Sequence, residues 1–293
     1  MNYRHAFHAG NFADVHKHLV LLALLDSLQR KPTPLFYMDT HAGRGRYDLH
    51  GEAASRGAEW LDGIARLITL QPVNEDLRRY LDAVRDIARP PLASQAPALQ
   101  QYPGSPLLAA RQLGPADRIV LVEKQPQEAQ ALQEAVRRRG LSVVCGDGYA
   151  TLKTYLPPRE NRGLVLIDPP YESEREFLDA QQALASGLRR WPNGMFALWY
   201  PIKAGMQASR LHTGLRTSGL RKLLRVDLNL RPADSPVGLN GSGLIIANPP
   251  WQFETRILPA LQEAATALAP RDADVARGAG GADHVHVAWL VGE

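Results

Sequence analysis

The strongest constraint on the fold is a regular alternation of short apolar runs with longer amphipathic ones in the second two-thirds of the chain. "RIVLVEK", "LSVVCGDG" and "GLVLIDPPY" are typical of buried strands, and "QPQEAQALQEAVRRRG", "YATLKTYL" and "EFLDAQQALASGLRRW" are typical of the helices between them. Repeated β-α-β units of this kind form a mainly parallel sheet with helices on both faces. The sequence therefore predicts a doubly wound α/β fold.

The first hundred residues contain one more strand and an inserted segment. "TPLFYMD" indicates a strand that ends at Asp39, and the preceding pattern predicts a helix from about Ala13 to Gln29, capped by Asn11. "AEWLDGIARLI" and "EDLRRYLDAVRDIA" repeat apolar residues at helical spacing without a strand signal. We expect a small inserted helical subdomain at 51–101 within a main domain formed by 1–50 and 102–293. A further helix should follow, with Ser105 as its N-cap.

Composition excludes several classes of protein. A 293-residue chain with 45% hydrophobic residues can bury a substantial core, and its net charge of +4 is only mildly basic. The single cysteine, Cys145, excludes an internal disulfide framework and a cysteine-based zinc site. The apolar run "LVLLALL" is far shorter than the roughly 20 residues of a membrane-spanning helix. Since no secretory leader is evident, we expect a soluble, cytoplasmic protein.

Acidic residues stand at the ends of four predicted strands. They are Asp39 before "THAGRG", Glu123, Asp147 before Gly148, and Asp168 before "PPY". Each alone is an ordinary turn former, but ligands of doubly wound sheets bind beyond the carboxyl ends of the strands. A glycine loop beside His41, followed by a carboxylate that accepts ribose hydroxyls, indicates a nucleoside-type cofactor. The dinucleotide fingerprint is incomplete, because "AGRGRYD" lacks the third glycine, and a phosphate-binding GxxxxGK[ST] loop is absent.

The loop, the acid, "GDG" and "DPPY" in this order resemble the Rossmann-fold S-adenosylmethionine-dependent amino-methyltransferases. The resemblance extends over nearly the whole chain: "YRHAFHAGNFADVHKH", "DTHAGRGRY", "YPGSPLLA", "ALWYPI", "SGLIIANPPW" and "HVHVAWLV" are similar to segments of the bacterial 23S ribosomal RNA adenine-N6 methyltransferases. This resemblance implies a class I methyltransferase fold, S-adenosylmethionine as cofactor, S-adenosylhomocysteine as product and 23S ribosomal RNA as partner.

The resemblance also implies roles for particular residues. Tyr3 matches a tyrosine that lies near the substrate base, and Lys17 is an additional candidate for the cofactor site. The positions that match the family's cofactor contacts are His18, His41, Ser105, Glu123, Asp147, Gly148 and Asp168.

Chemistry explains why a strand should end in "DPPY". An aromatic amine is a poor nucleophile, because its lone pair is delocalised into the ring. The carboxylate of Asp168 and the carbonyl of Pro169 could each accept one N–H of the amine and aim its lone pair at the methyl group. Two prolines stiffen this turn, and the ring of Tyr171 would stack on a base swung out of its helix. We therefore expect Asp168, Pro169 and Tyr171 to be catalytic.

Two other features have competing interpretations. "NPPW" at Asn248 also fits the tetrapeptide, but it follows the cofactor acids by several elements, so we expect a turn residue there. His5, His8, His16 and His18 lie close together without cysteines or paired carboxylates, so we expect no metal. Arginines that could contact RNA phosphates cluster at 78–79, 137–139, 189–190 and 216–225.

Alternative functions remain open at this point. A DNA adenine-N6 methyltransferase would share the amine clamp but should carry a separate target-recognition domain, which we do not see. A protein methyltransferase acting on amide nitrogen would modify a polypeptide, and a non-catalytic RNA-binding module on the same fold would turn over no cofactor. We expect a monomeric enzyme.

Overall fold

The computed structural model describes residues 5–88, 99–205, 208–236, 238–269 and 284–292. Within them, one sheet has the strand order β10-β8-β9-β7-β6-β1-β4-β5. From β7 to β5 all neighbours are parallel, whereas β9 is antiparallel to β7 and the alternation continues through β8 and β10. The strands are β1 Phe36–Asp39, β4 Arg118–Glu123, β5 Leu141–Cys145, β6 Gly163–Ile167, β7 Met195–Ile202, β8 Leu223–Asn229, β9 Gly241–Ala247 and β10 Val285–Val291.

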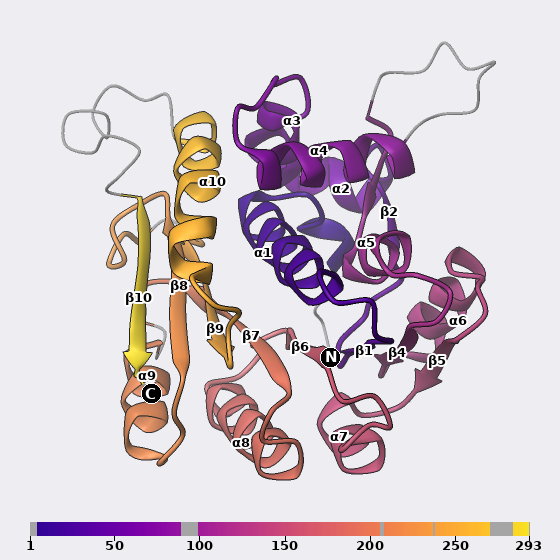
Figure 1. Ribbon diagram of the computed structural model, residues 1–293. Coiled ribbons are helices and arrows are strands. Elements are labelled where there is room, and N and C mark those ends of the chain that lie inside the picture. Colours follow the sequence, from indigo (N-terminus) through magenta and orange to yellow (C-terminus); the bar gives the residue numbers. More distant parts are fainter. Residues whose placement is uncertain (1–4, 89–98, 206–207, 237, 270–283, 293) are drawn as a thin grey trace.

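Helices cover both faces of this sheet (Figure 1). On one face α1, α5, α6 and α10 share an apolar cluster with Tyr37 of β1, and on the other α7, α8 and α9 pack with Phe36 and Met38 of the same strand. This alternation follows from the two-residue period of a strand. The predicted doubly wound, mainly parallel fold is confirmed. The helices are α1 Phe12–Gln29, α5 Ser105–Gln112, α6 Pro126–Ala135, α7 Gly148–Tyr155, α8 Arg175–Arg190, α9 Ala208–Thr217 and α10 Phe253–Leu268.

The chain order places a switch point beside β1. From β1 the chain continues to β4 and β5 on one side, and it then returns to build β6 and β7 on the other side. The carboxyl ends of β1, β4 and β6 therefore lie together at one edge of the sheet, and crevices of this kind hold ligands in doubly wound folds.

Helix α1 is buried on all sides. It begins where the sequence predicted, because the Asn11 side chain accepts a hydrogen bond from the backbone N–H of Asp14. Fourteen of its 18 residues are buried, since the helix lies between the sheet and α4, α5 and α10. The polar side chains on this helix are removed from water and must find partners inside the protein.

The inserted segment differs from its predicted structure in two places. "AEWLDGIARLI" forms a 3₁₀ helix, η2 Glu59–Asp62, and a short α3 Ile64–Leu67 rather than one helix. The break occurs at Gly63, where a Cβ would lie 2.1 Å from the Gly10 carbonyl oxygen and the next N–H donates to that oxygen. Two short strands, β2 Arg46–Asp48 and β3 Gln101–Pro103, pair antiparallel where the segment leaves and rejoins the main domain.

The insertion shares its core with the rest of the protein. Helix α4, Glu75–Ala88, has the predicted bounds, and its Leu77, Tyr80 and Leu81 belong to the same apolar cluster as α1 and α10. The remaining short helices are α2 Glu52–Gly57 and η1 His5–Phe7. We keep 51–101 as the working bounds of the insertion, which packs against the helix layer on one face of the sheet.

Candidate active site

A cavity of about 580 Å³ opens at the carboxyl ends of β1, β4, β5 and β6. This volume is typical of small-molecule sites. Pro169 and Lys17 lie in its wall, whereas Tyr171 does not, and Tyr3 lies outside the described residues. The structure also brings together in this wall every other residue that the resemblance assigned to the cofactor: His18, His41, Ser105, Glu123, Asp147, Gly148 and Asp168.

Two glycines let backbone form part of the wall. Gly43 has a φ of 61°, and a Cβ there would lie 2.2 Å from the Tyr47 hydroxyl. At Gly148 a Cβ would lie 2.0 Å from the carbonyl oxygen of Thr40. The loop after β1 and the start of α7 therefore touch through their backbones, and a side chain at Gly148 would push them apart.

Glu123 lies at the end of β4 with both carboxylate oxygens oriented by backbone. One oxygen accepts the N–H of Gly43 at 2.9 Å, and the other accepts the N–H of Gln125 at 2.7 Å. Burial raises the pKa of this carboxyl, and the backbone donors oppose that rise. Each oxygen retains accepting capacity, so Glu123 can receive two ligand hydroxyls, as on a ribose.

Asp147 has a structural contact as well as a place in the cavity. Its Oδ1 caps α7 by accepting the N–H groups of Tyr149 and Ala150, and its Oδ2 lies 3.1 Å from Nζ of Lys124. Although burial opposes ionisation, the Ala150 N–H and Lys124 lower the pKa of Asp147. The residue is therefore a rigidly held carboxylate at the cavity wall.

Ser105 does not cap α5 as predicted; Gly104 occupies the N-cap position. The Ser105 hydroxyl instead donates to Oδ2 of Asp39 at 2.6 Å. Its only proton is thereby used, so the oxygen can act only as an acceptor toward the cavity. Burial raises the pKa of Asp39 to about 6.

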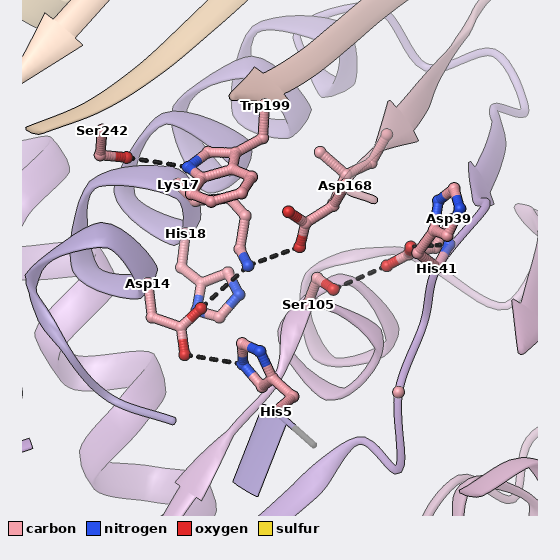
Figure 2. Close-up of polar contacts among 12 residues, drawn as sticks. His5, Asp14, Lys17, His18, Asp39, His41, Ser105, Asp168, Trp199 and Ser242 are labelled. Carbon is pink, nitrogen blue, oxygen red and sulfur yellow. Dashed lines mark hydrogen bonds and ion pairs between the residues drawn. The ribbon is translucent and has the colours of Figure 1, made fainter. Parts of the chain in front are cut away.

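Asp168 belongs to a buried network of charges (Figure 2). Nζ of Lys17 lies between two carboxylates, 2.5 Å from Oδ2 of Asp168 and 2.9 Å from Oδ1 of Asp14. Nε2 of His5 donates to the other oxygen of Asp14 at 3.0 Å. Lys17 contacts Oδ2, and no hydrogen bond among the described residues engages Oδ1, so Oδ1 is the oxygen of Asp168 with both acceptor positions open to a ligand.

These charges support one another. Burial by itself would lower the pKa of Lys17, but Asp14 and Asp168 outweigh it and raise that pKa well above its usual value. Burial likewise opposes ionisation of Asp14, but His5 and Lys17 hold its pKa well below the usual value. Lys17 and Asp14 are therefore both charged at neutral pH.

The ring of Tyr171 does not face the cavity, which corrects the expectation that it stacks on a base there. It is 5% exposed and packs on Phe177 at 4.5 Å between centroids, and its hydroxyl donates to the Trp199 carbonyl at 2.6 Å. With a φ of 50°, the residue turns its ring into the apolar cluster behind the sheet. A short motif specifies the residue but not the side to which its ring points.

Trp199 is the aromatic residue that lies beside Asp168 instead. Ile167 and Leu198 are paired in β6 and β7, so Trp199 comes next to Asp168 across the strands. Its ring is half-buried, with Nζ of Lys17 5.8 Å from the centroid and its N–H on Ser242 at 2.9 Å. Figure 2 shows the three side chains of Lys17, Asp168 and Trp199 together.

A family model described as "RsmJ: Ribosomal RNA large subunit methyltransferase D, RlmJ" matches residues 32–278, most of the chain. The chain belongs to this RlmJ family. It is 38% identical to Ribosomal RNA large subunit methyltransferase J of Haemophilus influenzae over 92% of this chain and 95% of the relative. It is 37% identical to the protein of that name from Escherichia coli over 100% of both chains.

A solved relative supports the fold. The crystal structure of protein LPL1258 from Legionella pneumophila has a TM-score of 0.81 and 32% sequence identity, and the match covers 96% of this chain and 97% of that one. Membership of the RlmJ family confirms the resemblance seen in the sequence, and the observed topology confirms the Rossmann-like methyltransferase fold.

The second tetrapeptide of this RlmJ-family chain, Asn248 to Trp251, lies at the edge of the sheet opposite the cavity. Strand β9 is antiparallel to β7, and its last residue, Ala247, pairs with Phe196 near the beginning of β7. The side-chain amide of Asn248 donates to the carbonyls of Pro192 and Gly194, both at 2.8 Å. Asn248 is thus a turn residue at the edge opposite Asp168, as predicted.

The four N-terminal histidines have separate partners. His5 pairs with Asp14, His8 with Glu59, His16 with Ser242 and His18 with Tyr102. In the part of the chain that the structure describes, no group of three His, Cys, Asp or Glu side chains could hold a metal ion. Over the same residues, no helix is both long and apolar enough to span a membrane.

The arginine clusters are partly committed to internal contacts. Arg79 pairs with Asp26, Glu75 and Asp76; Arg138 donates to the carbonyls of Ala110, Leu113 and Gly114; Arg190 donates to those of Lys153 and Leu156; and Arg225 pairs with Asp227. Their neighbours Arg78, Arg137, Arg139, Arg189, Arg216 and Arg221 are exposed. Arg190 is exposed as well, so these seven arginines are the members of the clusters that solvent can reach freely.

Sequence reasoning missed the charge network around Lys17. It proposed Lys17 only as an additional cofactor contact, and it assigned Asp14 no role in the site. One signal was present: Asp14 and Lys17 are three residues apart, hence on one face of a helix that is otherwise strongly apolar. Charges in that setting indicate buried partners.

Proposed function

We propose that this protein transfers a methyl group from S-adenosylmethionine to the N6 amine of an adenine in 23S ribosomal RNA. One observation carries the proposal: in a chain of the RlmJ family, the Asp168–Pro169 turn faces the same cavity as the residues suited to the cofactor. When bound, S-adenosylmethionine supplies a methyl group on a positively charged sulfur. The protein then has to hold the amine and receive a proton.

The cavity fits such a cofactor. The two free acceptor positions of Glu123 suit the ribose hydroxyls, and Asp147 and Gly148 lie in the same wall, where a base would be bound. Ser105, limited to accepting, suits the ammonium group of the methionine part. His41 and His18 line the same wall, and burial lowers their pKa values to about 4 and about 3, so both are neutral.

The amine is held by two acceptors on one short turn. Oδ1 of Asp168 and the carbonyl oxygen of Pro169 each accept one N–H, which directs the nitrogen lone pair toward the methyl carbon. Bound S-adenosylmethionine would give its methyl group to this lone pair and keep the C–S electron pair on sulfur, leaving as S-adenosylhomocysteine. The nitrogen then loses one proton to Asp168. Lys17 keeps the carboxylate oriented throughout by holding Oδ2.

The target base needs a surface as well as a clamp. The ring of Trp199 is half-buried and lies next to Asp168 on the neighbouring strand, outside the described cavity wall, and it offers one in place of the buried Tyr171. The resemblance assigns Tyr3 to the substrate base as well. We also propose a monomeric enzyme that works in the cytoplasm, where bacterial ribosomal RNA is made.

Replacing Asp168 tests the clamp. We expect Asp168→Asn to reduce transfer of labelled methyl to unmodified 23S RNA at least about 100-fold, because the proton acceptor is lost. Asn248→Ala, in the matching tetrapeptide at the opposite edge, is the control and should retain activity. Full activity in Asp168→Asn together with loss of activity in Asn248→Ala would show that the turn at Asn248, and not the turn at Asp168, holds the amine.

A further inference from the structure

A row of three hydrogen-bonded side chains leads from the cavity into the insertion. Nδ1 of His18 on α1 lies 2.7 Å from the hydroxyl of Tyr102 on β3, and that hydroxyl lies 3.0 Å from the hydroxyl of Tyr80 on α4. All three side chains are buried, with exposures of 1% or less. Tyr80 belongs to the inserted segment, so the row connects that segment to the wall of the candidate site.

Only one arrangement of donors and acceptors along the row gives every hydroxyl proton an acceptor. His18 is neutral, because burial lowers its pKa to about 3, so one ring nitrogen carries the hydrogen. If Nδ1 carried it, His18 would donate to Tyr102 and Tyr102 to Tyr80, and the Tyr80 proton would have no acceptor among the described residues. In the opposite direction Tyr80 donates to Tyr102, Tyr102 donates to Nδ1, and no buried hydroxyl is left unsatisfied.

The direction of the row determines what His18 can bind. Because Nδ1 accepts from Tyr102, the hydrogen must be on Nε2, the ring nitrogen left for the cavity that His18 lines. An Nε2–H donates to an anion, whereas a bare Nε2 would accept from a cation. The methionine part of the cofactor carries both a carboxylate and an ammonium group, so the tautomer selects between them.

We propose that Tyr80 and Tyr102 fix the tautomer of His18, so that its Nε2–H donates to the carboxylate of the bound cofactor. The inference rests on the proposed function, because it takes the ligand to be S-adenosylmethionine. Tyr102 and Tyr80 act through His18 and are positioning residues. The insertion thereby contributes to cofactor binding.

The tautomer is measured directly on the full-length protein without ligand. Long-range ¹H–¹⁵N spectra distinguish the two neutral forms of histidine, and His18→Gln identifies the His18 signals by their loss. We expect the Nε2–H form in the wild type and the appearance of the Nδ1–H form in Tyr102→Phe. An Nδ1–H form in the wild type would overturn the proposal.

Binding is measured by calorimetry with two unreactive ligands, S-adenosylhomocysteine and its decarboxylated analogue. Tyr102→Phe should bind S-adenosylhomocysteine roughly fivefold to tenfold more weakly, because the hydrogen bond from His18 to the carboxylate is weakened. It should bind the decarboxylated analogue as tightly as the wild type does. Tyr80→Phe should lose less, because Tyr102 can still donate to His18. Tyr200→Phe, which removes a buried hydroxyl bonded to Asp227 away from the cavity, is the control and should bind both ligands normally.

The possible failures are distinguishable. Equal weakening for both ligands in Tyr102→Phe would show general damage to the site and would overturn the role of the carboxylate. Unchanged affinity of Tyr102→Phe for both ligands would also overturn the role of the carboxylate. A wild-type protein that binds neither ligand would contradict the proposed function, and the spectra of the free protein would still decide the direction of the row.

Discussion

At the residue scale, the site depends on charges that are stabilised inside the protein rather than by water. Lys17 and Asp14 are almost inaccessible, and removing such groups from water is costly unless each has partners of opposite charge. Here one ammonium group serves two carboxylates, and His5 completes the hydrogen bonding of Asp14. The position of Asp168 is therefore tied to the beginning of α1, although the two are about 150 residues apart in sequence.

Asp14→Asn should remove a stabilising buried charge. We expect a loss of about 3 kcal/mol in the free energy of unfolding at pH 7, because Lys17 and His5 lose their shared partner. The pKa of Asp14 is lowered in the folded protein, so its contribution is present above its unfolded pKa of about 3.9 and is lost as the pH falls further. Urea unfolding at pH 7 and at pH 3 checks this. A difference between wild type and variant that is the same at both pH values would contradict the assignment.

Glu123→Gln should weaken cofactor binding with little effect on folding. The new amide group presents a donor to the backbone N–H of Gly43 or Gln125, where the carboxylate accepted both. We expect affinity for S-adenosylhomocysteine to fall about tenfold or more by calorimetry. Glu134→Gln, at an exposed position on α6, is the control and should bind normally. Unchanged affinity in Glu123→Gln would place the ribose elsewhere.

The types of residue in the site could be predicted from the sequence more reliably than the directions in which their side chains point. The acids at the strand ends were identifiable because each follows an apolar run, and the cavity brings Glu123, Asp147 and Asp168 together. The sequence could not show that the Tyr171 ring points behind the sheet, because its partners there, Phe177 and the Trp199 carbonyl, are reached only in the folded chain. Nor could it pair Lys17 with Asp168, because no local pattern connects them.

At the element scale, the site is made where secondary-structure ends meet. The loop after β1 contacts both β4, through Gly43 and Glu123, and the beginning of α7, through Thr40 and Gly148. These contacts involve backbone, so they tolerate little change in side-chain volume. The spacing of β1, β4 and α7 therefore sets the width of the cavity.

Gly148→Ala should widen this junction. Its Cβ would meet the Thr40 carbonyl oxygen at 2.0 Å, so one of the two loops must move. We expect cofactor affinity to fall at least tenfold and the free energy of unfolding to drop by about 1–3 kcal/mol. Gly146→Ala, two residues away, is the matched control: its Cβ would come no closer than 4.0 Å to Val144. Equal behaviour of the two variants in calorimetry and urea unfolding would contradict the close-contact argument.

Long elements were predictable and short ones were not. The strands and helices from β4 onward have strong periodic patterns, and α4 and the beginning of α1 were placed within a residue. The three-residue strands β2 and β3 are too short to produce a pattern. The division of a predicted helix at Gly63 is caused by contact with the Gly10 backbone, which is a tertiary effect.

At the scale of the whole molecule, sheet topology separates the two similar tetrapeptides. Parallel β6 brings Asp168 to the edge where Glu123 and Asp147 line the cavity, and antiparallel β9 carries Asn248 to the opposite edge. The insertion packs on α1 and α10, as Figure 1 shows. Two sequence segments of nearly equal chemistry thus have different roles because of strand direction alone.

The most direct test of the account is transfer of labelled methyl from S-adenosylmethionine to 23S RNA lacking its modifications, beside duplex DNA and total protein, with mass mapping of the product. The account predicts label on N6 of one adenine of the RNA and little on the other two substrates. Preferred labelling of DNA or of protein would contradict the proposed substrate, and RNA binding without transfer to any substrate would contradict catalysis itself.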